Sequence, residues 1–302
     1  MDDIRDITFV TYADLPAMDG DDALALGLLE DRGFSCGCAV WNSPDVDWER
    51  AGLCVVRSTW DYHLHVDKFL QWVKERSSQI VNSASLINWN SNKRYLVDLE
   101  RRGVNIVPTS FFAKGAPVTV RQLAQRRGWT RIIVKPAIGL ATFGVKSFQL
   151  PEEWVDAQQH AEELLKDGDI LVQQFMNGVA DYGERALIFF NGQYSHAVRK
   201  EPFQKLATAG GAGEESVRAT NAERIFAEEV IGSLRETPLY ARVDIVPNEQ
   251  SIALLELELV EPSLFLSFDT AAPARFADAL ERVLSNRRHS VQPDVLPESA
   301  SG

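Results

Sequence analysis

Three acidic residues near the carboxyl end of the chain have a spacing that suits metal binding. Asp244 lies in the first of two apolar segments that together span residues 240–261, and Glu256 and Glu258 lie in the second. Side chains alternate across a β-strand, so Glu256 and Glu258 should share one face while the intervening leucines share the other. Carboxylate oxygens are the ligands that Mg²⁺ takes, with waters or phosphate oxygens completing its shell. The three acids are therefore candidate metal ligands; the alternative is the solvated outer face of an amphipathic hairpin.

The metal-site interpretation also predicts how these acids affect the stability of the metal-free protein. Three carboxylates that face one small volume without a metal should repel one another. Removing one of them is then expected to leave the metal-free protein as stable as before, or slightly more stable. A solvated strand face would instead change the free energy of unfolding by no more than about 0.5 kcal/mol.

Cationic residues lie where they could meet phosphate groups. Lys135 ends the apolar segment 131–136, and a lysine there needs an anionic partner. Gly139 and Gly144 lie in the small-residue turn that follows, where backbone N–H groups could approach phosphate oxygens. This turn matches neither a Walker A sequence nor G-x-G-x-x-G, so by itself it is a weak signal.

Three arginines are further candidates. Arg185 and Arg199 flank the Asn191-Gly192 turn symmetrically and could converge on one spot, although two surface arginines are an equally ordinary outcome. Arg57 follows a short apolar strand, at the edge of a sheet where ligands bind in parallel α/β folds. Its guanidinium could hold a substrate carboxylate in a bidentate manner, or it could pair with Asp61 and only shape the loop.

The elements that must position these residues alternate in type. Strands and helices alternate over residues 7–81, which predicts a small parallel sheet with helices on its faces. Mixed elements and an Asn-Gly hairpin follow, and residues 208–214 are glycine-rich enough to be a lid or a plain loop. The expected domains are an N-terminal domain, a central subdomain, a C-terminal subdomain and a disordered tail, in residues 1–88, 89–174, 175–289 and 290–302.

Composition limits the class of protein. The chain has 302 residues, 45% of them hydrophobic, which is enough for several packed layers. A formal net charge of −12 argues against binding to nucleic acid, and no apolar run reaches the roughly 20 residues of a membrane span. Cys36, Cys38 and Cys54 have no disulfide or zinc pattern, so we expect reduced thiols and a cytoplasmic protein. A homodimer or a higher homo-oligomer is a possible assembly.

In their order along the chain, these elements resemble the ATP-grasp superfamily, in particular its glutathione-synthetase-like branch, from Ile7 to about Leu284. The resemblance implies an α/β fold of three domains, in which a parallel βαβ domain precedes two α+β subdomains that hold ATP between them. It implies ATP and two Mg²⁺ ions as cofactors, the metals on Asp244, Glu256 and Glu258. It assigns Arg185 and Arg199 to the transferred phosphoryl group. The residues that it assigns to ATP are Lys93, Lys135, Gly139, Thr142, Gly144, Gln173, Gln174, Phe175 and Met176.

Within that superfamily the segments RSTWDY, HAVRKEP and ELELVEPSLFL are most similar to the cyclo-ligases of cycloserine biosynthesis. The implied reaction activates the carboxylate of an O-ureido-serine-like amino acid as an acylphosphate, which a nitrogen of the same molecule attacks. Arg57 and Lys200 are the expected substrate contacts. An intermolecular carboxylate–amine ligase and a non-catalytic ATP-binding module remain as alternatives. The turn sequence Gly139-Leu140-Ala141-Thr142 departs from the usual G-x-G-S-x-G of the family.

Overall fold

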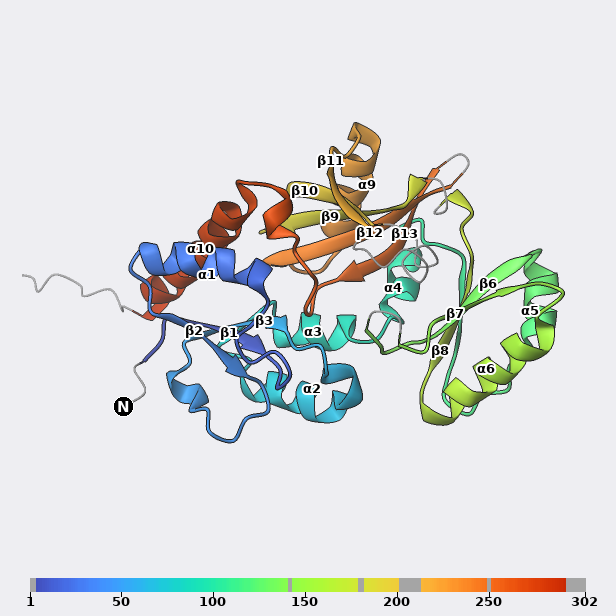
Figure 1. Cartoon of the computed structure of the whole chain (residues 1–302), viewed down its shortest axis with the longest axis horizontal. Helices are drawn as coiled ribbons and strands as arrows, with labels where there is room; N and C mark the ends of the chain where they lie inside the picture. Colours follow the sequence, from blue (N-terminus) through green and yellow to red (C-terminus); the bar gives the residue numbers. More distant parts are fainter. Residues whose placement is uncertain (1–3, 141–142, 179–181, 201–212, 249–250, 292–302) are drawn as a thin grey trace, which may run out of the picture.

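The chain folds into three β-sheets with helices packed against their faces (Figure 1). The computed structural model describes residues 4–140, 143–178, 182–200, 213–248 and 251–291. One sheet is parallel and two are antiparallel, so the predicted α/β class is confirmed.

The N-terminal sheet has the strand order β2-β1-β3-β4, and all its pairs are parallel. Parallel neighbours need crossover connections, and helices α1 and α2 supply two of them. Asp19 caps α1 by accepting a hydrogen bond from the backbone N–H of Asp21. The bounds of this part are β1 Ile7–Thr11, α1 Gly20–Asp31, β2 Cys36–Val40, η1 Trp48–Arg50, β3 Leu53–Ser58, η2 Tyr62–Leu64, α2 Val66–Glu75 and β4 Ile80–Val81.

Two short helices lead to the central sheet, whose order is β5-β8-β6-β7 with antiparallel pairing. Helices α5 and α6 pack against it and bury its apolar side in one cluster with Ile132, Val134 and Val172. The bounds are α3 Ala84–Asn90, α4 Tyr95–Arg101, β5 Thr109–Phe112, α5 Val120–Arg127, β6 Arg131–Pro136, β7 Lys146–Gln149, α6 Trp154–Asp167 and β8 Ile170–Gln174.

The C-terminal sheet is antiparallel in the order β11-β10-β9-β12-β13. Asn191 and Gly192, both with positive φ, make the tight turn between β9 and β10, as their sequence predicts. The bounds are β9 Glu184–Phe190, β10 Gln193–Lys200, β11 Glu214–Val217, α9 Asn221–Gly232, β12 Tyr240–Asn248, β13 Ser251–Glu258, η3 Leu266–Phe268 and α10 Ala272–Val291.

The last helix, α10, packs against elements from the beginning of the chain. It lies beside α1 (Figure 1), and Phe276 packs edge-on against Phe9 of β1 and stacks on Phe190 of β9. One sheet falls in each of the ranges 1–88, 89–174 and 175–289, which we keep as the proposed domains. The hydrophobic core is nevertheless continuous from β1 through α10 to β9, because apolar side chains of all three share one cluster.

Candidate active site

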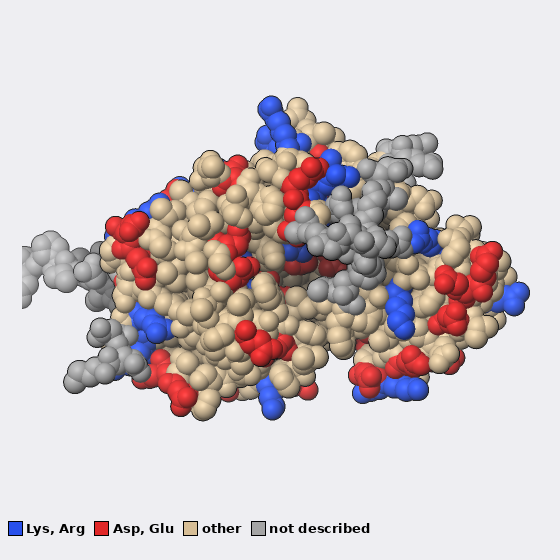
Figure 2. All heavy atoms as spheres, viewed as in Figure 1, with Lys and Arg blue, Asp and Glu red and all other residues tan. Residues whose placement is uncertain are grey.

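A cavity of about 430 Å³ lies between the central sheet and the C-terminal sheet. Its walls come from Tyr62, from the segment after β6, from Gln173 of β8 and from the facing strands β10, β12 and β13. Figure 2 shows basic and acidic atoms side by side in the recess at the middle of this face. The charged residues that line it are Glu184, Glu214, Asp244, Glu256, Glu258 and Glu261 with Lys93, Lys135, Lys200 and Arg242.

The hairpin of β12 and β13 brings its acids together as its alternation predicts. Asp244 is paired with Glu256 across the two strands, and Arg242 with Glu258. On the opposite face Leu257 is only 1% exposed, so that face is core. The register shifts after Asp244, which is the irregularity expected of a bulge beside a site.

Two side chains from the preceding helices hold β13 in place. The Asn90 side chain donates to the carbonyl of Leu257 and accepts from the backbone N–H of Leu259. The hydroxyl of Tyr95 accepts from the backbone N–H of Leu257 at 2.9 Å. These bonds replace ladder partners that an edge strand lacks, and they fix the strand that carries Glu256 and Glu258.

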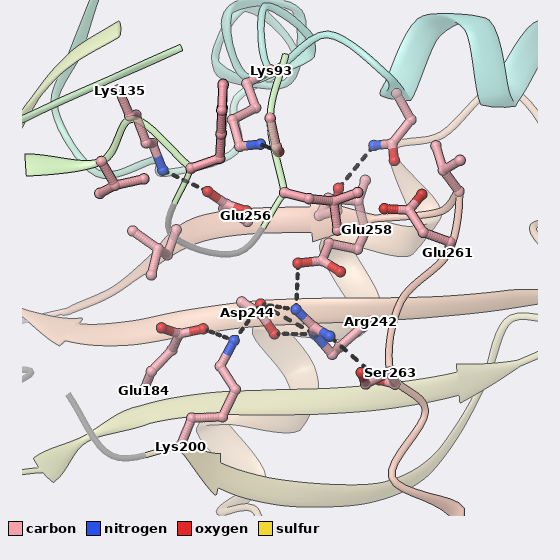
Figure 3. Close-up of a pocket in the computed structure, with 18 of the residues that line it drawn as sticks. Lys93, Lys135, Glu184, Lys200, Arg242, Asp244, Glu256, Glu258, Glu261 and Ser263 are labelled. Carbon is pink, nitrogen blue, oxygen red and sulfur yellow. Dashed lines mark hydrogen bonds and ion pairs between the residues drawn. The ribbon is translucent and has the colours of Figure 1, made fainter. Parts of the chain in front are cut away.

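One ion-pair network is centred on Asp244, which is 1% exposed (Figure 3). Its carboxylate accepts hydrogen bonds from Arg242 Nε at 2.9 Å and from Lys200 Nζ at 2.9 Å. Arg242 also contacts Glu258, and Lys200 also contacts Glu184. Burial alone would raise the pKa of Asp244, but the charges of Arg242 and Lys200 hold it below its ordinary value.

A second pair joins the central sheet to the hairpin. Lys135 at the end of β6 donates to Glu256 Oε1 at 2.5 Å. Burial disfavours the charge of Glu256, yet the ammonium groups of Lys135 and Lys93 hold its pKa well below the ordinary range. Lys93, in the turn before α4, donates to the carbonyl of Gly139 at 2.8 Å. The predicted anionic partner of Lys135 is therefore Glu256.

The three carboxylates are not left without cations, as the sequence led us to expect. Asp244, Glu256 and Glu258 each contact a lysine or an arginine, so their charges are balanced inside the protein. Within the part of the chain that the structure describes, no three His, Cys, Asp or Glu side chains are grouped so that they could hold a metal ion. A metal role for these acids stays a proposal, and it requires the cations to exchange partners.

The residues expected to contact ATP divide into those at the cavity and those behind it. Lys93, Lys135, Gly139 and Gln173 line the cavity. Gly144 has a φ of +67°, and a Cβ there would meet Pro136 at 2.9 Å, so glycine is required for the turn. Thr142 lies outside the described residues.

The structure gives less support to the three predicted ATP contacts at the end of β8. Gln174, Phe175 and Met176 are not among the described residues that line the cavity. The Arg131 guanidinium lies 3.8 Å from the ring centre of Phe175, and Met176 packs in a small apolar cluster with Val107 and Val246. The backbone N–H groups of Gln174 and Phe175 donate to the carbonyls of Pro108 and Arg131, so contact of these three residues with a nucleotide stays a proposal.

Arg185 and Arg199 are direct neighbours across β9 and β10, as expected for two residues that converge. Arg185 lies 3.7 Å from Glu223, and its Nη1 is buried without a hydrogen-bond partner in the described chain. Arg199 donates to the carbonyl of Tyr182 and pairs with Glu215. At this end of β9 and β10 the described residues that line the cavity are Glu184 and Lys200. Arg185 and Arg199 are adjacent to them in sequence, so alternation turns the two arginines to the other face of the sheet, and they are not part of the cavity wall.

The predicted substrate contact of Arg57 does not fit the structure. Its side chain is 2% exposed and donates to Asp22 at 2.9 Å and to the carbonyl of Pro262 at 2.6 Å. The guanidinium also lies over the rings of Tyr240 and Phe276. Arg57 therefore has a structural role, joining β3 to α1 and to the segment after β13. Its carboxylate partner is Asp22, and the alternative partner Asp61 instead accepts from the indole of Trp41.

Arg242, Glu184 and Glu261 belong to the site and are absent from the sequence prediction. Arg242 precedes Asp244 by two positions, so the alternation that grouped the acids also places this cation on their face. Glu184 precedes Arg185, and the cation that it contacts, Lys200, is opposite it across the two strands. Glu261 lies beyond the end of β13, where alternation no longer predicts a direction.

Glu261 makes the stability depend on pH. Burial, with help from the charge of Glu258, raises the pKa of Glu261 to about 8, against smaller opposing effects of Lys93, Arg242 and Arg57. Between about pH 4.5 and pH 8 the folded state then binds a proton that the unfolded state releases, so stability falls as pH rises. The proton on Glu261 should make the folding equilibrium constant fall by up to about tenfold for each pH unit in this range. We expect Glu261→Gln to abolish this contribution to the pH dependence. Urea unfolding of both proteins at pH 5.5 and 8 measures the difference; identical pH slopes would contradict it.

Comparison with known proteins agrees with this geometry. Residues 7–83 match the family model described as the N-terminal domain of D-cycloserine synthetase DcsG. The cycloserine biosynthesis protein DcsG of Streptomyces lavendulae is 33% identical over 268 residues, covering 82% of this chain and 88% of the relative. The crystal structure of D-cycloserine synthetase DcsG superposes with a TM-score of 0.84 at 30% identity, covering 92% and 99% of the two chains.

A more distant solved structure shows how far the fold extends. The D-alanine–D-alanine ligase from Bacillus anthracis, complexed with ATP, gives a TM-score of 0.64 at 14% identity, covering 95% of this chain and 99% of the ligase. Fold and site together define an ATP-grasp ligase, as the sequence predicts. Within that class, the chain belongs to the DcsG family of synthetases. No helix in the described ranges is both long and apolar enough to cross a membrane.

Proposed function

We propose that this chain uses Mg²⁺-ATP to close an O-ureido-serine-like amino acid into cycloserine. The observation that carries the proposal is one cavity whose described wall brings four cations together with the acids of β12 and β13, in a chain of the DcsG family. Phosphoryl transfer depends mainly on positioning and on neutralising charge, and these side chains provide both.

The ion pairs of the ligand-free site prepare it for a charged nucleotide. Asp244, Glu256 and Glu258 supply oxygen donors of the kind that Mg²⁺ takes, and their present partners are the cations that a triphosphate would attract. Binding of Mg²⁺-ATP would let Lys135 and Lys93 turn to phosphate oxygens while the acids turn to metal. Asp244, Glu256 and Glu258 would hold Mg²⁺, which would supply positive charge to neutralise the negative charge on the phosphates. Each exchange trades one opposite-charge contact for another, so no buried charge is left alone.

The chemistry has two parts. The substrate carboxylate attacks the γ-phosphorus of ATP, the bond to the bridging oxygen breaks, and ADP leaves. A nitrogen of the same molecule then attacks the acyl carbon, loses its proton and expels phosphate, which closes the ring. Hydrolysis of the ureido group by water, with release of carbon dioxide and ammonia, removes the carbamoyl group from that nitrogen and completes cycloserine. Lys200 and Arg242 line the cavity beside these acids and would stabilise the phosphate as it leaves. Arg185 and Arg199 do not line the cavity, so their proposed contact with the transferred phosphoryl group requires their side chains to move.

Product analysis tests this function. The full-length chain is incubated with Mg²⁺-ATP and O-ureido-serine, and ADP and product mass are measured together. The proposal expects one ADP for each cycloserine formed. A linear product that contains a second amine would instead identify an intermolecular ligase, and nucleotide binding with no ADP release for any amino acid would identify a non-catalytic module.

The lysines at the cavity should control nucleotide affinity. We expect Lys135→Ala to weaken ATP binding at least about tenfold, because a charge-assisted hydrogen bond to phosphate contributes roughly 1.5–3 kcal/mol. Lys93→Ala should act in the same direction. Calorimetry with Mg²⁺ and a non-hydrolysable ATP analogue measures both. Lys146→Ala, a change of an exposed lysine on β7, is the matched control and should bind like the wild type; equal affinity in all four proteins would exclude the proposed contacts.

The predicted lid is only partly placed by the structure. Residues 208–212 lie outside the described residues, whereas Gly213 and Glu214 line the cavity. Glu214 is the first residue of β11 and lies opposite Lys200 of β10 in the strand register, so the end of the predicted segment is a strand. A role in excluding water from the acylphosphate stays part of the proposal.

A further inference from the structure

Glu261 stands apart from the other acids of the cavity. It is 7% exposed, lines the cavity just beyond the end of β13, and its Oε2 is buried without a hydrogen-bond partner in the described ranges. Figure 3 shows its carboxylate near that of Glu258 at one end of the pocket, away from Lys135. Burial without a partner disfavours the charged form of this acid, and a cation placed beside it would favour that form.

The cations of the cavity are engaged elsewhere. Lys135 is paired with Glu256, Lys200 with Asp244 and Glu184, and Arg242 with Asp244 and Glu258. Lys93 donates to the carbonyl of Gly139, and Arg57, behind Pro262, is paired with Asp22. In the described chain Glu261 is thus an acid of this cavity that forms no ion pair with a basic side chain, and a cation from outside the protein would satisfy it.

The surroundings favour an ammonium group over a metal ion. A divalent cation needs several oxygen ligands, and the described residues hold no cluster of three acidic or other metal-ligating side chains. A primary ammonium group needs one carboxylate and a few neutral acceptors. Tyr62, Val260, Ser263 and Phe265 line the same cavity as Glu261 and supply apolar surface with a small number of polar groups.

We propose that Glu261 binds the α-ammonium group of the amino-acid substrate and thereby selects amino acids over their neutral analogues. This inference rests on the proposed function, which supplies an amino acid whose carboxylate is activated in the same cavity. It makes Glu261 a specificity residue: with the ammonium held at one end of the pocket, the carboxylate of the same α-carbon is directed toward the phosphate-binding side.

Calorimetry can test the preference without turnover. The full-length chain, with Mg²⁺ and a non-hydrolysable ATP analogue, is titrated with O-ureido-D-serine and with its α-hydroxy analogue, in which a hydroxyl replaces the ammonium group. Wild-type protein should bind the amino acid at least about tenfold more tightly, the range of one charge-assisted hydrogen bond. Glu261→Gln should bind both compounds equally, Glu261→Asp should keep part of the preference, and Glu228→Gln on the exposed face of α9 should keep all of it.

The outcomes separate this inference from the proposed function. An unchanged preference in Glu261→Gln, or no preference in the wild type, would overturn the role of Glu261. If the preference depends on Glu261 but no ADP is released from ATP with this amino acid, the role of Glu261 stands and ring closure of this substrate is refuted. A loss of Mg²⁺ affinity in Glu261→Gln with the amino-acid preference intact would reassign Glu261 to the metal and overturn the inference.

Discussion

Glu256→Gln is expected to reduce ADP release by roughly a thousandfold, the effect of removing one preorganised charged group from a phosphoryl-transfer site. Glu256 lies opposite Asp244 in the register and pairs with Lys135, so it connects the proposed metal ligands with a proposed phosphate contact. A glutamine keeps the shape and one acceptor oxygen but not the charge. Steady-state ADP release at saturating Mg²⁺-ATP and substrate measures the loss.

The same substitution should also destabilise the ligand-free protein. The Lys135 side chain is 8% exposed, and without the Glu256 charge it keeps only a neutral acceptor, which costs about 1–3 kcal/mol. This sign is the opposite of the one expected from three repelling carboxylates. Glu228→Gln is again the control, and Glu258→Asn should keep part of the activity, because the asparagine amide keeps one oxygen of the kind that Mg²⁺ takes. Turnover of Glu256→Gln at the wild-type rate would exclude a metal or phosphate role for this hairpin.

The local pattern of the sequence predicts the elements that carry the site. Two-residue alternation predicts that Glu256 and Glu258 share a face and that Leu257 is core, and the Asn191-Gly192 turn predicts the pairing of Arg185 with Arg199. These properties depend on neighbours a few residues apart, so a single sequence contains them. The class of protein also follows, because the order of elements is specific even where each motif is weak.

The partners of charged side chains are much harder to predict. Arg57 pairs with Asp22 from another element and with the carbonyl of Pro262, which is 205 positions away, and nothing in its local sequence distinguishes this from an exposed strand end. The unpaired state of Glu261 depends on how the cations of β6, β10 and β12 are shared, which only the packed sheets determine. The ion-pair network around Asp244 is partly predictable from the sequence, because alternation already places Arg242 on the same face of the strand.

Arg242→Met should be the most destabilising change in the site, lowering the free energy of unfolding by about 3–5 kcal/mol, because it breaks a buried ion-pair network and leaves its acids without a full set of cations. Arg242 is 7% exposed and contacts both Asp244 and Glu258, and its side chain also donates to the carbonyl of Ser263. Methionine has a similar length and fills the space, so the loss reports the charge and the hydrogen bonds more than a cavity.

Urea unfolding of Arg242→Met, Asp244→Asn and the double variant measures the coupling between the two residues. The double variant should be more stable than the sum of the single losses predicts, because removing the Asp244 charge relieves the acid that Arg242→Met leaves with Lys200 as its remaining cation. Arg224→Met, which removes an exposed pair with Glu228 on α9, is the matched control and should change stability by about 0.5 kcal/mol or less. If Arg242→Met unfolds at the same urea concentration as Arg224→Met, the network does not stabilise the fold, and the acids of β12 and β13 are held in place by their strands alone.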